Sequence, residues 1–151
     1  RYSYANWFSL GGTFNSMDAI DREKRLAEGT GQASLTYGQR IPNQPYRYAN
    51  FDASFYWHDL FGKGNMLSLT YDSYYQHEFP LYWEDFGDPD TKARVPEQFS
   101  HNLTLNYSVA KGRYNFSLEC RNLTDEKLYD NYSLQKAGRA FYGKVRVYFG
   151  K

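Results

Sequence analysis

Hydrophobic and polar residues alternate along six segments of the chain. In the clearest segment, residues 98–110, one parity carries Phe99, Leu103, Leu105, Tyr107 and Val109, and the other carries Ser100, Asn102, Thr104, Asn106 and Ser108. Successive side chains of a β-strand point to opposite faces, whereas a helix would scatter these residues around its axis. The pattern therefore predicts a strand with one apolar and one polar face, interrupted on the apolar side only by His101.

The same alternation predicts five further strands, at residues 2–18, 46–59, 65–79, 114–130 and 138–149. We expect an all-β fold of about six long antiparallel strands, connected up and down in sequence order. The segments are about 12–17 residues long, whereas strands of globular proteins average roughly 5–6 residues. Apolar runs are too short for transmembrane helices, which need about 20 residues.

The links between the predicted strands alternate in length. Residues 22–45 and 80–97 are long and residues 131–138 intermediate, whereas residues 60–64 and 111–113 are short. In an antiparallel meander all the longer links fall at one end of the sheet. This asymmetry is typical of outer-membrane β-barrels, and a tilted strand of about 9–11 residues crosses a bilayer.

The charges on the predicted polar faces agree with a barrel. Glu119, Arg121, Lys144 and Arg146 lie there, where a water-filled lumen would leave them solvated. Six strands cannot close a barrel, because the smallest have about eight and an open edge in hydrocarbon leaves backbone groups unsatisfied. We therefore expect an arc of a larger barrel, and the absence of Met before Arg1 agrees with a fragment.

Composition excludes several other classes of protein. Of the 151 residues 20% are aromatic, yet the mean hydropathy is −0.80, so the two kinds of residue must be sorted by position. A net charge of +1 gives no basic field for nucleic acid. The single Cys120 excludes a disulfide framework and a cysteine zinc site. No catalytic motif is present, so we expect no enzyme activity, no cofactor and no metal.

Two stretches near the end of the chain carry a resemblance to a known family. Residues 122–130 read NLTDEKLYD, and residues 138–142 read GRAFY before an aromatic-ended strand. Both resemble the C-terminus of TonB-dependent outer-membrane receptors, and residues 41–45 (IPNQP) before Tyr46 are similar to the family's entry into a strand. These motifs cover residues 41–46 and 114–149. The chain departs from the family pattern where Gly150 and Lys151 follow Phe149.

The resemblance implies a barrel of about 22 strands closed around an N-terminal plug. Residues 1–151 would be its C-terminal part, without the plug and the earlier strands. Such receptors lie in the outer membrane of Gram-negative bacteria and import ferric siderophores, haem, cobalamin or oligosaccharides. The implied partners are membrane lipids, the rest of the barrel and the plug, the TonB–ExbB–ExbD complex acting through that plug, and a surface lipoprotein.

Two other functions compete with active transport. A passive porin or another large barrel would keep the fold without the plug or energy coupling, and only the resemblance argues against it. A soluble β-sandwich that binds carbohydrate would use the aromatic residues of segment 82–86 as a platform. Strand length and the one-sided long loops argue against this third hypothesis.

Candidate ligand-binding residues are chosen by their place in the expected outer loops: His77, Tyr82, Trp83, Asp85 and Arg139. A haem ligand is conceivable at His77, but a solvated rim histidine is the simpler interpretation. Aromatic and acidic residues of segment 82–90 could stack on a sugar or bind calcium. The spacing is not that of an EF-hand, so an acidic surface loop is favoured. Arg139 is expected chiefly to support the last loop.

Overall fold

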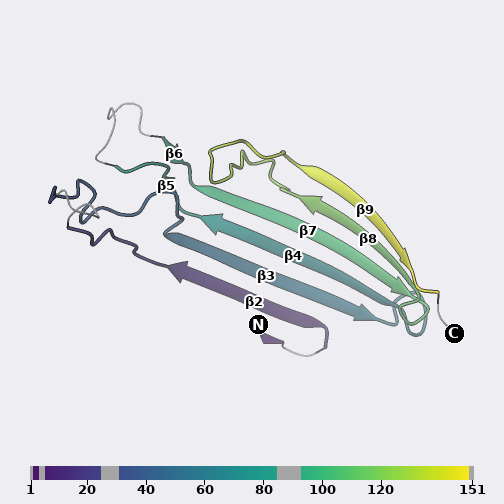
Figure 1. The fold of residues 1–151 in the computed structure, drawn as a ribbon. Coiled ribbons are helices and arrows are strands. Elements are labelled where there is room, and N and C mark those ends of the chain that lie inside the picture. The colour runs from purple at the N-terminus through teal and green to yellow at the C-terminus, as the bar shows by residue number, and fades with distance from the viewer. Residues whose placement is uncertain (1, 4–5, 25–30, 85–92, 150–151) are drawn as a thin grey trace.

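The computed structural model describes residues 2–3, 6–24, 31–84 and 93–149, and this part of the chain is all-β with no helix. One antiparallel sheet (Figure 1) has the order β1-β2-β3-β4-β7-β8-β9. Its strands are β1 (Tyr2–Ser3), β2 (Phe8–Ser16), β3 (Arg47–His58), β4 (Met66–Gln76), β7 (Gln98–Val109), β8 (Tyr114–Arg121) and β9 (Ala140–Val147). A separate hairpin pairs β5 (Phe79–Pro80) with β6 (Arg94–Val95). Within the described ranges no helix is long and apolar enough to traverse a bilayer.

The prediction of six long antiparallel strands is confirmed, and each of the six lies inside its predicted segment. The links of residues 17–46, 77–97 and 122–139 lie together at one end of the sheet, which we call the loop end (Figure 1). The turns of residues 59–65 and 110–113 lie at the opposite end, the turn end. The expected asymmetry of the connections is therefore present.

The first segment was wrongly predicted as one strand over residues 2–18. Instead β1 folds back on β2, with Tyr2 opposite Leu10 and Ser3 opposite Ser9. The pairing of β2 with β3 begins at Phe8, opposite Phe55, although β3 continues to His58, whose ring Nε2 lies 3.0 Å from the Asn6 carbonyl oxygen. Residues 2 and 3 thus pair with β2 and do not extend it along β3.

The fifth segment ends nine residues earlier than the predicted residue 130, because β8 stops at Arg121. Asn122 has a positive φ of 52° and is only 3% exposed. Its side chain accepts a hydrogen bond from Glu126 N (2.9 Å) and donates one to Glu126 O (2.8 Å). Asparagine tolerates this left-handed conformation better than most residues. The side-chain hydrogen bonds of Asn122 thus take the place of strand pairing, and the last long link begins at this residue.

Strand register keeps the two kinds of side chain on separate faces across the whole sheet. Leu69 pairs with Phe55 on one side and with Leu105 on the other. The apolar face so defined carries Phe8, Leu10, Phe14, Phe51, Phe55, Trp57, Leu67, Leu69, Phe99, Leu103, Leu105, Phe116, Leu118, Phe141 and Val145. The polar face carries the alternate positions, where the Ser54 and Thr70 hydroxyls lie 3.0 Å apart.

Burial is inverted relative to a water-soluble sheet. Phe99, Phe116 and Phe141 on the apolar face are 47%, 44% and 75% exposed, whereas Ser54 on the polar face is 1% exposed. An antiparallel sheet in water packs its apolar face on a core, but no described segment covers this one. Among the described residues, the buried hydrophobic side chains lie at the loop end, at Tyr46, Phe79 and Val95.

Candidate ligand-binding site at the loop end

A small apolar cluster ties the three long links together at the loop end. Tyr46, Phe79 and Val95 are 5%, 0% and 0% exposed, and the half-buried Ala19 and Tyr129 pack against them. Tyr46 also donates its hydroxyl hydrogen to the Ile41 carbonyl, and burial raises the pKa of this phenol. Residues from separate links are thus fixed relative to each other, which gives the sheet an ordered rim.

Backbone hydrogen bonds extend this order within the first long link and from that link to the next. Met17 N donates to Tyr46 O at 2.9 Å, and Ile41 N donates to Ala19 O at 2.9 Å. Asn43 N donates to Pro80 O at 2.8 Å, which joins the first long link to the β5–β6 hairpin. Amides paired in this way are held in place rather than left to solvent.

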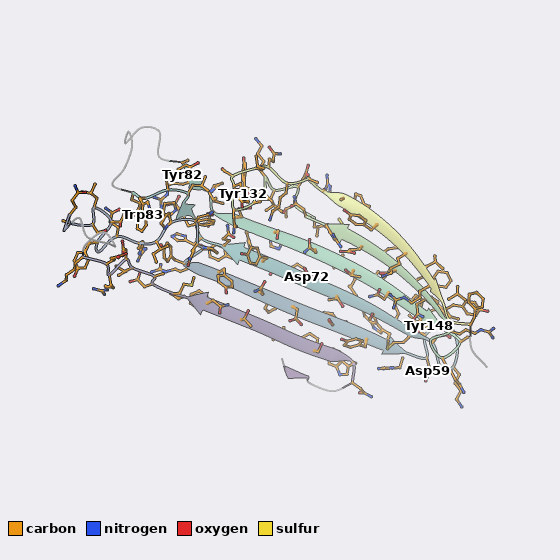
Figure 2. The ribbon with its side chains drawn as sticks, in the orientation of Figure 1. Asp59, Asp72, Tyr82, Trp83, Tyr132 and Tyr148 are labelled. Atoms are coloured by element: carbon orange, nitrogen blue, oxygen red, sulfur yellow. The ribbon has the colours of Figure 1, made fainter. Side chains whose placement is uncertain are left out.

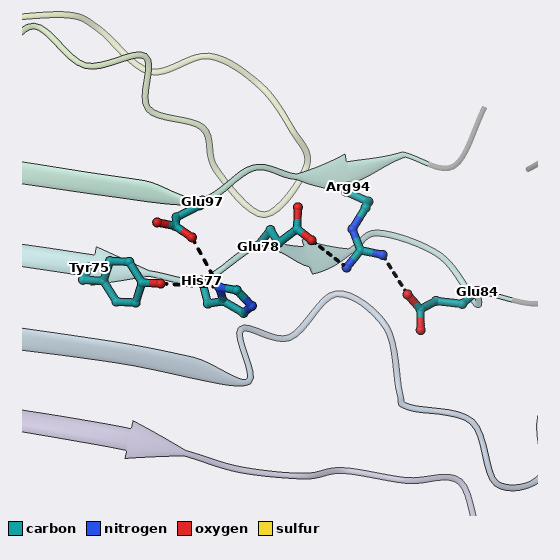
Figure 3. A network of polar contacts seen from close by, with 6 residues as sticks. All are labelled: Tyr75, His77, Glu78, Glu84, Arg94 and Glu97. Atoms are coloured by element: carbon teal, nitrogen blue, oxygen red, sulfur yellow. Dashed lines mark hydrogen bonds and ion pairs between the residues drawn. The ribbon is translucent and has the colours of Figure 1, made fainter. Parts of the chain in front are cut away.

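The β5–β6 hairpin presents one arginine to two carboxylates (Figure 3). Phe79 pairs with Val95 and both side chains are buried, so the next pair, Pro80 and Arg94, is offset to the other side. The Arg94 guanidinium lies 2.7 Å from Glu84 Oε1 through Nη1 and 3.4 Å from Glu78 Oε1 through Nη2. These charge-assisted contacts fix the orientation of the guanidinium plane.

His77 follows β4 directly and is anchored through both its backbone and its ring. Its N–H donates to Arg47 O at 3.0 Å. Ring Nδ1 lies 3.4 Å from Glu97 Oε2 and 3.4 Å from the Tyr75 hydroxyl oxygen (Figure 3). One nitrogen cannot donate to the carboxylate and accept from the phenol at the same time. The presence or absence of a hydrogen on Nδ1 therefore decides whether this nitrogen donates to Glu97 or accepts from Tyr75.

These groups border an open pocket of about 370 Å³. Charged side chains from two of the long links and the start of β3 line it: Asp18, Arg40, Arg47, Glu78, Glu84 and Arg94, together with His77 and Tyr46. Arg40 Nε lies 3.0 Å from Asp18 Oδ1, and its guanidinium lies 4.9 Å from the centre of the Tyr46 ring. Three cations and three acids line the pocket, and Arg40 and Arg94 are paired with acids, which suits a ligand that offers both hydrogen-bond donors and acceptors.

Of the residues predicted from loop position, His77 lines this pocket. Tyr82 is 70% exposed and Trp83 is half-buried, and both lie at the loop end beside Glu84 (Figure 2). Arg139 lies elsewhere, because its guanidinium donates to Leu123 O at 3.4 Å and its N–H to Asp125 Oδ1 at 2.7 Å. It therefore interacts with its own link. Asp85 and the rest of the predicted 82–90 loop beyond Glu84 lie outside the described residues.

Sequence reasoning missed the ionic part of the pocket. Arg94 meets Glu78 and Glu84 only because the two-residue strands β5 and β6 pair in one register. Strands that short have no readable periodicity. A usable signal was the charge next to the predicted strand ends, at Arg47 and Glu78. Among the described residues no group of three His, Cys, Asp or Glu side chains could hold a metal ion.

Comparison with known proteins adds no relative to this picture. No family model, no curated protein and no solved structure matches the chain. The functional argument is therefore built on the geometry of the sheet and its two ends.

Proposed function

We propose that the chain forms part of the wall of a TonB-dependent outer-membrane receptor. In this proposal it serves active import of a scarce nutrient, such as a ferric siderophore, haem, cobalamin or an oligosaccharide. The observation that carries the proposal is the inverted burial of the sheet, with an apolar face open to the surroundings and small polar side chains buried on the other side.

The dimensions of the sheet support a place in a bilayer. Its six long strands contain 8–12 residues, and a tilted strand needs about 9–11 to cross the hydrocarbon core. Within the sheet the backbone groups of neighbouring strands pair with each other, as hydrocarbon requires. The apolar face would then contact lipid.

The polar face supports a hydrated lumen. Asp52 and Asp72 are directly opposite each other on β3 and β4, and like charges in this position repel unless water screens them. Asn102 Nδ2 donates to Asp72 Oδ2 at 2.6 Å. A water-filled interior tolerates such a pair, whereas a dry sandwich core would not.

The edges of the sheet support a larger assembly. Among the described residues, β9 pairs only with β8, and residues 11–16 of β2 pair only with β3. In the proposal, further strands from outside these 151 residues pair with both edges and close the barrel. The loop-end pocket then belongs to the mouth of the barrel, where ligands enter.

The test starts with the native polypeptide that contains this chain, extracted from the outer-membrane fraction. We expect an intact mass several times 17.8 kDa and an electrophoretic mobility that changes on heating. Uptake of a ferric hydroxamate, haem, cyanocobalamin and a maltooligosaccharide is then compared with and without a protonophore. We expect one probe to be imported only by energised cells.

The other outcomes would identify the competing functions. Uptake that a protonophore does not change would contradict active transport and favour a passive porin. A monodisperse species of 17.8 kDa that is soluble without detergent would exclude the barrel altogether. In that case the aromatic residues after Leu81 should be tested for glycan binding.

A further inference from the structure

At the turn end, two turns that are distant in sequence form one unit. Lys111 N donates to Gly64 O at 3.2 Å, and Ala110 N donates to Asn65 Oδ1 at 3.1 Å. Asn65 Nδ2 in turn donates to the Tyr107 hydroxyl at 3.1 Å. The turns of residues 59–65 and 110–113 are therefore locked together, and we call this unit the turn platform.

The turn platform gathers positive charge. Lys63, Lys111 and Arg113 are all exposed, and within residues 59–65 and 110–113 the one acid is Asp59. Asp59 Oδ1 accepts a hydrogen bond from Gly64 N at 2.6 Å, so this carboxylate is used inside its own turn. Among the described residues, no acidic side chain forms an ion pair with any of the three cations. Figure 2 places Asp59 at this end of the sheet together with Tyr148, whose N–H donates to Arg113 O at 2.9 Å.

Exposed aromatic rings accompany these cations. Phe61 is 85% exposed and its ring meets Tyr107 edge-on at 6.3 Å, and Phe149 is 89% exposed. Trp57 lies on the apolar face one residue before the end of β3, and Trp7 stacks on Phe55 of the same strand. Aromatic residues of this kind are enriched at the level of lipid headgroups. Rings and cations thus occur together where the apolar face ends.

We propose that the turn platform binds anionic phospholipid headgroups of the phosphatidylglycerol class. The inference rests on the proposed function, because it requires that the apolar face contacts lipid. Charge complementarity selects the occupant, since each Lys or Arg near an anionic membrane surface strengthens binding about fivefold. At the loop end Arg40 and Arg94 are paired with acids, whereas Arg22, Lys127 and Lys136 are exposed there and serve below as the control for position.

The three tryptophans allow a local test on the full chain in bilayers. Trp7 and Trp57 report on the turn end and Trp83 on the loop end, so Trp83→Phe isolates the first pair and the double variant Trp7→Phe/Trp57→Phe isolates the last. Each protein is reconstituted in phosphatidylcholine with a minor fraction of acyl-brominated phosphatidylglycerol, or of brominated phosphatidylcholine as reference. We expect the brominated anionic lipid to quench the turn-end tryptophans several-fold more than its bulk fraction predicts, and Trp83 not to show this excess.

Charge variants show whether the excess quenching depends on the cations of the turn platform or on the net charge of the chain. Lys63→Gln/Lys111→Gln/Arg113→Gln should reduce the excess quenching to the value for bulk composition. The control Arg22→Gln/Lys127→Gln/Lys136→Gln removes the same charge from exposed residues at the loop end and should leave the excess unchanged. Raising potassium chloride should weaken the excess in the unaltered chain, since salt screens exposed charges. The salt titration uses the unaltered chain, so it does not depend on whether the platform variants fold.

Four results would overturn the inference. Equal quenching by the two brominated lipids, or excess quenching that survives the triple platform variant, excludes headgroup selection while leaving transport untouched. Loss of the excess in inorganic phosphate but not in chloride of equal ionic strength indicates a site for free anions instead. Absence of quenching by brominated phosphatidylcholine at both ends contradicts lipid contact itself and removes the proposed function as well.

Discussion

The irregular chain at the two ends of the sheet is held in place by different interactions. At the loop end, burial of Phe79 and Val95 fixes the long links, and the ionic groups of the rim are paired with each other. At the turn end there is no buried apolar side chain among the described residues, and Asn65 joins the turns by hydrogen bonds alone. The loop end therefore resembles the surface of a small soluble domain, whereas the turn end exposes both its rings and its cations.

The difference follows from the length of the connections. Links of about twenty residues or more can bring their own apolar residues together, and a link of four to seven cannot. A short turn must be stabilised by local backbone geometry, and Gly62, Gly64, Lys111 and Gly112 all have positive φ. Its long side chains are then directed outward, where they are available to a membrane surface or another partner.

The largest effect is expected for a variant that removes a buried side chain at the loop end. Phe79→Ala deletes a fully buried ring, and such truncations cost about 3–5 kcal/mol. We expect hydrogen exchange to accelerate at Asn43 N, which bonds to Pro80 O of the neighbouring link, and at Leu81 N, which bonds to Ala93 O across the hairpin. Lys111 N at the turn end should keep its protection.

The matched control is Phe149→Ala, which removes a ring that is 89% exposed. Exposed substitutions usually change stability by less than about 0.5 kcal/mol. If Phe79→Ala accelerated exchange equally at both ends, the two ends would form one cooperative unit, and the contrast between them would be wrong.

The second prediction tests the apolar face that separates the ends. Leu105→Arg introduces a charge in the middle of β7 on this face, and an arginine at the bilayer midplane costs about 2–4 kcal/mol in a membrane β-sheet. Asn106→Arg places the same charge one residue along, on the polar face, and should cost little. Urea titration of tryptophan fluorescence in bilayers measures both. Equal losses would mean that neither face contacts lipid.

The third prediction uncouples the two turns of the turn platform. Asn65→Ala removes the acceptor of Ala110 N and the donor to Tyr107, and net hydrogen bonds are worth about 0.5–1.5 kcal/mol each. We expect faster exchange at Ala110 N and Lys111 N, with Asn43 N unaffected. Asn50→Ala serves as the control, because its amide makes only an exposed contact with Thr13. Unchanged exchange at Lys111 would contradict the coupling.

The six long strands could be predicted because alternation is a local property of each segment. The errors arose where a neighbour decided the outcome. Residues 2–3 pair with β2 and do not extend it along β3, and the strand before Asn122 stops where side-chain hydrogen bonds of Asn122 take the place of strand pairing. Both events depend on pairing across the sheet, which the hydrophobic pattern of one segment does not contain.

The candidate site was less predictable than the fold for a related reason. His77 could be placed at the rim because the predicted strand 65–79 reaches the longer links there, and it lines the pocket. The contact of Arg94 with Glu84 requires a hairpin of two-residue strands. The contact of Lys111 with Gly64 requires two turns that are distant in sequence to lie side by side, where Asn65 also accepts from Ala110 N. Interactions between links depend on how the links fold in three dimensions. Composition shows only that the charges are present.

The smallest predicted effect concerns the hydrogen bonds that stabilise the ionised carboxylate of Asp21 within one long link. The Thr36 hydroxyl and then the Glu23 N–H donate to the Asp21 carboxylate, and these bonds lower the pKa of that carboxyl below 3.8. A lowered pKa means that the fold favours the ionised form, so the stabilisation is complete above pH 3.8 and is lost as pH falls through the folded-state value. Thr36→Val should raise the pKa toward 3.8, and Ser34→Ala, which spares the hydroxyl bonded to Asp21, should not. The titration of the Asp21 carboxyl carbon by NMR measures this shift. A titration unchanged by Thr36→Val would show that this hydrogen bond does not stabilise the Asp21 carboxylate, and the contrast with the cations of the turn platform, which have no acidic partner among the described residues, would then be weaker at this position.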